Sequence, residues 1–134
     1  MSIYELKYKI NKLELSRERI NELNQIEVKK INIKTDNMKS IIKIINPNEV
    51  VGLNNRWDDC DSWLELLYGL HKMRNFDIFN IESFSKFIED PYDLYDLPIV
   101  VKHNEEYYID GNGKHRLTMA KCLGLKKVKV IMYY

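Results

Sequence analysis

The clearest pattern of apolar and polar positions lies in the last third of the chain. Residues 107–109 are β-forming, residues 110–113 are typical of a turn, and apolar residues recur at helical spacing from Leu117 until Gly124. A glycine in that place suits the left-handed end of a helix. Residues 128–132 return to β-forming side chains. This stretch therefore predicts a strand, a glycine turn, a helix and a second strand.

Helices and short strands are also predicted in the first third of the chain. Apolar positions in residues 3–26 recur at gaps of three, four and seven, which favours one amphipathic helix or two helices broken near Ser16. The apolar stripe is narrow, so this segment could pack on its own domain or bind a partner. Residues 28–33 and 40–45 predict two short strands on either side of a turn at residues 35–37.

The middle of the chain predicts further helices and one strand. Ser62, with a glutamate three residues later, forms a capping box that opens a helix. Asn80 is a suitable cap for a helix over residues 81–89. Residues 90–95 begin with Asp and Pro, which suits one short helical turn, and a strand follows Pro98. Together these patterns predict a single α+β domain.

Length and composition narrow the class of protein. The chain has 134 residues, 45% of them hydrophobic, which suffices for one domain with a modest core. No apolar run is long enough to cross a bilayer, and residues 1–20 are too charged for a signal peptide, so we expect a cytoplasmic protein. Cys60 and Cys122 lack the spacing of a metal site, and we expect both thiols to be reduced.

The charges are distributed unevenly along the sequence. The formal net charge is only +1, which argues against a general DNA-coating protein. It divides into +4 over residues 1–43, −9 over residues 44–110 and +6 over residues 111–134. The basic last segment suits a phosphate ligand, whereas the acidic middle would repel a nucleic acid, so DNA binding is not favoured. The alternative is that these are solvated faces that neutralise one another after folding.

The predicted turn carries the strongest candidate chemistry. Glycines let a backbone approach a ligand closely, and the first amides of the following helix attract an anion. Lys114, His115 and Arg116 stand where those amides point. Cations at a helix N-terminus oppose the helix dipole, so this cluster suggests a bound anion. The ammonium and the planar guanidinium suit phosphate oxygens, and the imidazole can donate to phosphate in either protonation state.

Asp110 is the candidate carboxylate beside the turn. It could hold Mg²⁺ between itself and the phosphates, since Mg²⁺ in such sites needs only one or two carboxylates. It could equally be an Asx-type turn former that caps the following amides. We therefore treat Asp110 and His115 as the candidate catalytic residues and Asp110 as the candidate Mg²⁺ ligand.

Several segments of the chain, including this turn, resemble the ParB/sulfiredoxin-like superfamily. The similarity lies in a strand followed by Asp-Gly-x-x-x-His-Arg-Leu-x-x-Ala-Lys-x-Leu-Gly-Leu at residues 110–125, in Ile45 to Val50 followed by Arg56, and in the strand at residues 97–101. It covers roughly residues 41–134, which leaves residues 1–40 as an N-terminal helical extension with a short strand. The resemblance implies a small mixed sheet with packed helices that binds a nucleotide such as ATP, ADP or CTP.

The resemblance also implies which residues contact the nucleotide. The expected phosphate-binding residues are Gly111, Asn112, Gly113, Lys114, His115, Arg116 and Arg56. Members of the superfamily use this site for CTP-dependent DNA partitioning, ATP-dependent sulfinic acid repair, serine phosphorylation and nuclease activity. In sulfiredoxins the residue directly before His-Arg is the catalytic cysteine. Here that residue is Lys114, which argues against sulfinic acid repair.

Three functions are compatible with these observations. The first is nucleotide binding, with phosphoryl transfer or hydrolysis assisted by Mg²⁺. The second is a non-enzymatic interaction protein, such as a phage or mobile-element product. Its partner would contact the acidic aromatic tract that contains Tyr92, Asp93, Tyr95 and Asp96. The third and weakest is a ParB-like nuclease.

Overall fold

The computed structural model describes residues 3–56, 58–91 and 96–134 and has an α+β fold. Its helices are α1 (Ile3–Lys12), α2 (Arg17–Gln25), α3 (Trp63–Tyr68), α4 (Arg74–Asp77), α5 (Ile81–Glu89) and α6 (Lys114–Leu123), with a short 3₁₀ helix at Pro47–Glu49. Its strands are β1 (Lys29–Ile31), β2 (Ser40–Ile45), β3 (Val50–Asn54), β4 (Ile99–His103), β5 (Glu106–Ile109) and β6 (Val128–Tyr133). The strands form one mixed sheet in the order β1-β3-β5-β4-β6-β2.

The sheet combines parallel and antiparallel strand pairs. β3 runs parallel to both β1 and β5, and β4 runs parallel to β6. β4 and β5 form an antiparallel hairpin, and β2 pairs antiparallel with β6. The turn that follows β5 therefore leaves the middle of the sheet and leads directly into α6.

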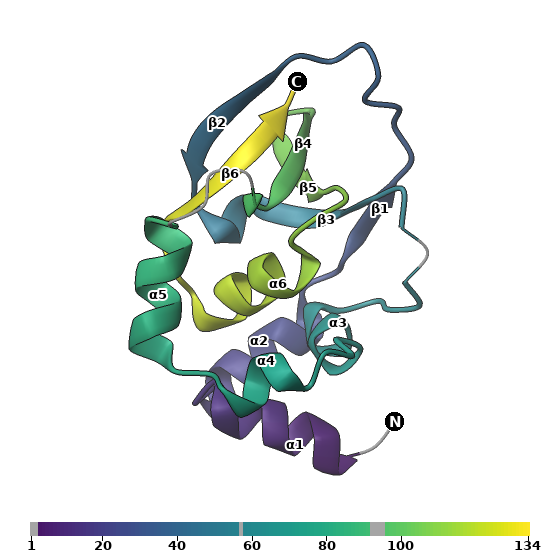
Figure 1. Ribbon diagram of the computed structural model, residues 1–134. Helices are drawn as coiled ribbons and strands as arrows, with labels where there is room; N and C mark the ends of the chain where they lie inside the picture. Colours follow the sequence, from purple (N-terminus) through teal and green to yellow (C-terminus); the bar gives the residue numbers. More distant parts are fainter. Residues whose placement is uncertain (1–2, 57, 92–95) are drawn as a thin grey trace.

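The helices gather on one side of the sheet in Figure 1, with α6 directly against it and α1 farthest away. α6 packs on α3, and α3 in turn contacts α1 and α2. Leu117, Ala120 and Cys122 of α6 are fully buried in the core. Within the described residues, no helix is both long enough and apolar enough to span a bilayer.

The first helical segment is broken where the sequence suggested. Ser16 caps α2, and its side chain accepts a hydrogen bond from the backbone N–H of Arg19. Leu13 and Leu23 are buried at 1% and 0% exposure in the same core cluster as the sheet residues. The narrow apolar stripe thus packs on the chain's own fold, which resolves the two alternatives left by the sequence.

The first two strands, β1 and β2, are separated in the sheet, although the sequence places them on either side of one turn. The turn is present, with Met38 N–H donating to the Thr35 carbonyl at 3.0 Å. However, β1 and β2 do not lie side by side, because they occupy opposite edges of the sheet. β2 pairs instead with β6 at the end of the chain, through contacts distant in sequence that local patterns do not record.

β3 was not predicted from the sequence. Its glycine, Gly52, lies so close to β1 that an added Cβ would stand 1.9 Å from the Lys29 carbonyl oxygen. The capped helices α3 and α5 and the strands β4, β5 and β6 are confirmed. The short helical turn predicted at residues 92–95 lies outside the described residues.

Candidate functional site

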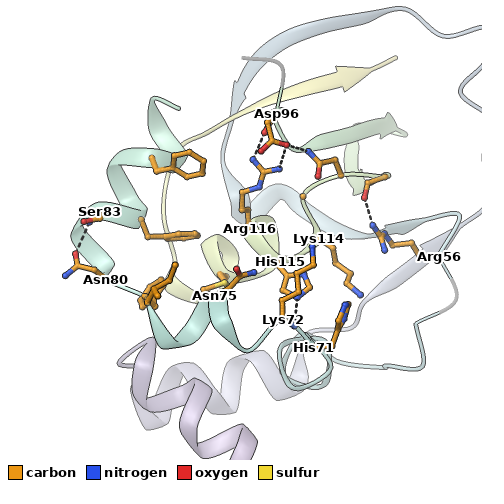
Figure 2. A pocket seen from close by; sticks show the side chains of 18 residues that line it. Arg56, His71, Lys72, Asn75, Asn80, Ser83, Asp96, Lys114, His115 and Arg116 are labelled. Carbon is orange, nitrogen blue, oxygen red and sulfur yellow. Dashed lines mark hydrogen bonds and ion pairs between the residues drawn. The ribbon is translucent and has the colours of Figure 1, made fainter. Parts of the chain in front are cut away.

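A cavity of about 700 Å³ opens beside the glycine turn, between α6 and the segment from His71 to Phe87. Its basic lining residues are Arg56, His71, Lys72, Lys114, His115 and Arg116. Its apolar lining residues are Ile78, Phe79, Phe84, Phe87 and Met119. Figure 2 shows Lys72, His115 and Lys114 together near the centre of the wall, with Asn80 and Ser83 on the opposite side. The cavity is therefore basic at one end and apolar at the other.

The turn at the basic end has the geometry that the sequence predicted. Gly111 and Gly113 have φ angles of +67° and +104°, a region that favours glycine. A Cβ on Gly113 would also stand 2.5 Å from the Pro98 Cβ, so this position admits no side chain. Gly113 begins α6 without a side-chain cap. The first amides of α6 therefore lack a cap and can bind an anion.

Asn112 fixes the turn against the preceding strand. Its side-chain amide donates to the Asp96 carboxylate at 2.9 Å and to the Leu97 carbonyl at 3.2 Å. Its own carbonyl accepts from the Ile99 N–H at 2.9 Å. The conformation of the turn is therefore set by the fold and does not depend on a ligand.

Lys114 forms an ion pair within the protein. Its ammonium lies 2.7 Å from the Asp58 carboxylate, and the two side chains are only 12% and 23% exposed. From the sequence, the cations at this helix start predict a bound anion. For Lys114 the structure supplies an internal carboxylate instead. A phosphate can use this lysine only by sharing it with Asp58 or displacing it.

The two arginines of the site also have protein partners. Arg116 donates to the Asp96 carbonyl and lies 3.6 Å from the Asp96 carboxylate, and burial lowers its pKa. Arg56 donates to the Gly111 carbonyl, and its expected contact with phosphate stays a prediction. Its buried Nε has no hydrogen-bond partner in the part of the chain that the structure describes. Both guanidinium groups therefore support the turn while facing the cavity.

His115 is held as a neutral imidazole. Its Nε2 accepts a hydrogen bond from the Lys72 backbone N–H at 3.3 Å, and its ring meets the His71 ring edge-on at 5.3 Å. Burial, together with the nearby Lys114, His71 and Lys72 charges, lowers the His115 pKa from 6.5 to about 4. Since Nε2 is an acceptor, Nδ1 carries the proton and is the nitrogen that can donate to a ligand.

The sequence gives no indication of the part of the cavity wall that lies beside His115. This part is formed by His71 and Lys72, to which the sequence analysis assigns no role. Both are exposed, and both line the cavity. Among the described residues, the Lys72 ammonium has no hydrogen bond or ion pair, unlike that of Lys114. Local sequence carries no signal for this placement, because α3 and α6 come together only in the folded core.

The apolar end of the cavity is formed mainly by aromatic rings. Phe79 and Phe84 lie with ring centroids 5.3 Å apart at an interplanar angle of 51°. Phe87 follows on the same helix, α5, and lines the same space. These rings can stack on or enclose a flat apolar group, which the basic end cannot do.

Asp110 lies outside this cavity wall. Its Oδ1 accepts from the Asn54 side-chain amide at 3.3 Å, and its N–H donates to the Ile99 carbonyl at 2.9 Å. The described residues contain no group of three or more His, Cys, Asp or Glu side chains arranged to hold a metal ion. The lining carboxylate Asp96 is already engaged by Asn112 and Arg116. Among the described residues, the Asp110 side chain is hydrogen bonded to the Asn54 amide and not to the amides of the turn, so the Mg²⁺ role and the turn-forming role of Asp110 both stay predictions.

The proposed partner-binding tract is described only at one residue. Tyr92, Asp93 and Tyr95 lie outside the described residues. Asp96 has a side chain that is 64% exposed and forms part of the cavity rim with Arg116. The interaction-protein hypothesis therefore stays a prediction.

Comparisons with known proteins do not assign the chain to a family. No family description matches it, and no curated protein or solved structure is significantly similar. The resemblance to the ParB/sulfiredoxin-like superfamily thus rests on the sequence motifs alone.

Proposed function

We propose that this protein binds a nucleotide in the cavity, with the phosphates at the basic turn and the base against the aromatic wall. The observation that carries the proposal is the division of one cavity into a basic end and an aromatic end. A nucleotide has the same two parts. The volume of about 700 Å³ lies within the range typical of small-molecule sites.

Several donors support the phosphate end. The uncapped first amides of α6 favour an anion, and Lys72 brings an ammonium without a described partner. The Nδ1 of His115 and the guanidinium of Arg56 add further donors. Lys114 contributes fully only if Asp58 gives up its ion pair. The side chains and amides that line the basic end of the cavity therefore supply the donors and positive charge that a phosphate needs.

The proposal concerns binding and includes no chemical step. Phosphoryl transfer needs a group that orients the acceptor and charge that stabilises the transferred phosphoryl group. Asp110, the candidate for this role, lies outside the cavity wall, and His115 is neutral and hydrogen bonded to the backbone. Hydrolysis, phosphoryl transfer and DNA cleavage stay hypotheses from the resemblance.

Lys72 provides the most direct test. A thermal-shift panel of ATP, ADP, CTP and GTP identifies the best ligand, and calorimetric titration then compares the wild type with Lys72→Glu. We expect at least a tenfold loss of affinity, because an attractive charge at the phosphates becomes a repulsive one. Lys127→Glu, in the exposed segment after α6, makes the same charge change at a residue that does not line the cavity and should leave the affinity nearly unchanged.

The aromatic end is tested separately with inorganic triphosphate. Phe84→Ala should weaken the nucleotide and leave binding of triphosphate unaltered, since the latter has no base to stack. If no nucleotide binds, or if Lys72→Glu binds as well as the wild type, the proposal is wrong. If Phe84→Ala weakens both ligands equally, the base does not lie on the aromatic wall.

A further inference from the structure

The two edges of the sheet are built differently. Edge strand β1 has three residues, and its exposed side chains are lysines, Lys29 and Lys30. Natural sheets use such short, charged edges to avoid pairing with other chains. Edge strand β2 has six residues and leaves Ile41, Ile42 and Ile44 exposed at 45%, 52% and 55%. β2 thus lacks the protection that β1 has.

The backbone of β2 is also open to another strand. Lys39 and Tyr134 exchange both backbone hydrogen bonds, at 3.0 and 2.9 Å. Antiparallel strands alternate, so Ile41 and every second residue after it point their backbone groups toward β6. Ser40, Ile42 and Ile44 therefore point their N–H and C=O groups away from the sheet. β2 is the last strand in the sheet order, and among the described residues no strand pairs with those groups.

We infer that β2 pairs with β2 of a second copy of this chain, antiparallel and with Ile42 on the twofold axis. In this register Ile42 faces its own copy, and Ser40 faces Ile44, so all the outward backbone groups find partners. Lys43 then lies opposite Ile41 of the other copy. The six-stranded sheet becomes continuous across two chains.

The sequence of β2 favours a second copy as the occupant. The pairing sets Ile42 against its own copy, and each Ile44 lies diagonal to the Ile42 of the other copy on the same face of the sheet. A register centred on Lys43 would place two lysines face to face, a like-charge pair that destabilises a sheet. Twofold dimers are also the commonest protein assemblies, and each uses one surface patch twice, as this pairing does.

The dimer leaves the candidate cavity open. No lining residue of the cavity belongs to β2, and Figure 1 shows β2 at the edge of the sheet beyond β6. The inference is therefore independent of nucleotide binding. A six-residue strand pair is small beside the roughly 800 Å² that each partner buries in a standard interface. We accordingly expect a reversible dimer that forms at protein concentrations of about 10 to 100 μM.

Analytical ultracentrifugation over a concentration series tests the pairing. The full chain should shift from monomer to dimer, and Ile42→Lys should remain monomeric, because it sets two lysines against each other on the axis. Tyr4→Lys removes a side chain that is 82% exposed on α1, far from β2 in sequence, and should dimerise like the wild type. Far-ultraviolet circular dichroism confirms that each variant is folded. A wild type that stays monomeric at 500 μM, or an Ile42→Lys variant that still dimerises, overturns the inference and leaves a strand of another protein as the occupant.

A cysteine scan tests the register. Both native cysteines are free and buried, so an introduced surface cysteine is the accessible thiol among the described residues. Ile42→Cys should form an interchain disulfide under mild oxidation, because paired Cα atoms at about 5.5 Å lie within disulfide range. Ile44→Cys is equally exposed, but its two copies would be separated by about 13 Å along the strands, so it should not cross-link. Cross-linking of Ile44→Cys and not of Ile42→Cys would contradict the proposed register.

Discussion

The lysines of the core and the lysines of the cavity differ in what they donate to. Lys9 and Lys121 are only 1% and 4% exposed, and neither has a carboxylate within salt-bridge distance in the described structure. Lys9 donates to the carbonyls of Leu67, Tyr68 and Leu70 at the end of α3. Lys72 and Lys114 line the cavity, one without a described partner and the other paired with Asp58.

Lys121 shows how a buried ammonium becomes a structural element. It donates to the carbonyls of Asn48 at 3.1 Å and Val50 at 2.7 Å, and lies 4.7 Å from the centre of the Trp63 ring. Its three donors are directed at fixed protein groups, so it joins α6 to the start of β3. A cation serves a ligand only where its donors are not all committed to the protein. By this criterion Lys72 suits ligand binding better than the more conspicuous Lys114.

The largest effect that this comparison predicts is on stability. Lys121→Ala should lower the free energy of unfolding by about 2–4 kcal/mol, because it leaves a cavity and two carbonyls without a donor. Lys127→Ala, an exposed lysine beyond the same helix, should change it by less than about 0.5 kcal/mol. Urea unfolding of both variants provides the measurement. A similarly small loss of unfolding free energy in both variants would show that the hydrogen bonds of Lys121 do not stabilise the fold.

The second prediction concerns the pH dependence of the same variant. Burial lowers the pKa of Lys121 from 10.5 to about 8 in the folded protein. Between these values the unfolded chain binds more protons than the native one, so stability rises with pH. The stability gap between the wild type and Lys121→Ala should therefore widen from pH 8 to 10.5 and stay level below pH 8. Urea unfolding of both proteins at a series of pH values measures this difference. A difference that does not change with pH would mean that the Lys121 ammonium is solvated in the folded protein.

The elements best predicted from the sequence were those with local signals. The capped starts of α3 at Ser62 and α5 at Asn80 have side chains that satisfy nearby amides. The end of α6 at Gly124 needs a left-handed residue, with a φ of +70°. Such requirements act over three or four residues, so a sequence records them directly.

What the sequence could not predict depended on contacts distant along the chain. β3 was missed because its short apolar run becomes a strand only by pairing with β1 and β5, which are distant in sequence. The turn at residues 110–116 was predicted, but the Asp58–Lys114 ion pair and the contact of Lys72 with His115 were not, since Asp58 and Lys72 each come from a separate loop. The sequence therefore predicted too much positive charge at the turn, because the Asp58 carboxylate offsets the charge of Lys114.

The third prediction concerns the Lys114–Asp58 ion pair. Lys114→Ala should cost about 1 kcal/mol of stability, since it leaves a partly buried carboxylate without its cation. The helix dipole alone would predict a neutral or stabilising effect, because it leaves out Asp58. Asp58→Asn in the Lys114→Ala background should recover part of the loss. A double-mutant cycle measures the coupling, and additive effects would mean that the pair contributes nothing.

The smallest predicted effect, on His115, reports on the site most directly. Its pKa is lowered from 6.5 to about 4 by burial and by Lys114, His71 and Lys72, so the ring should stay neutral down to about pH 4. Between pH 6.5 and 4 the unfolded chain binds the extra proton, so this histidine makes stability fall as the pH falls.

Histidine ring resonances followed by NMR, and assigned by their loss in His115→Asn, measure this pKa. A bound phosphate near the ring adds a negative charge that stabilises the imidazolium, so saturating nucleotide should raise the pKa. A midpoint near 6.5 without ligand would mean that the ring is solvated and does not accept from Lys72. A low pKa that ligand leaves unchanged would place the phosphates away from His115, although the cavity could still hold the nucleotide.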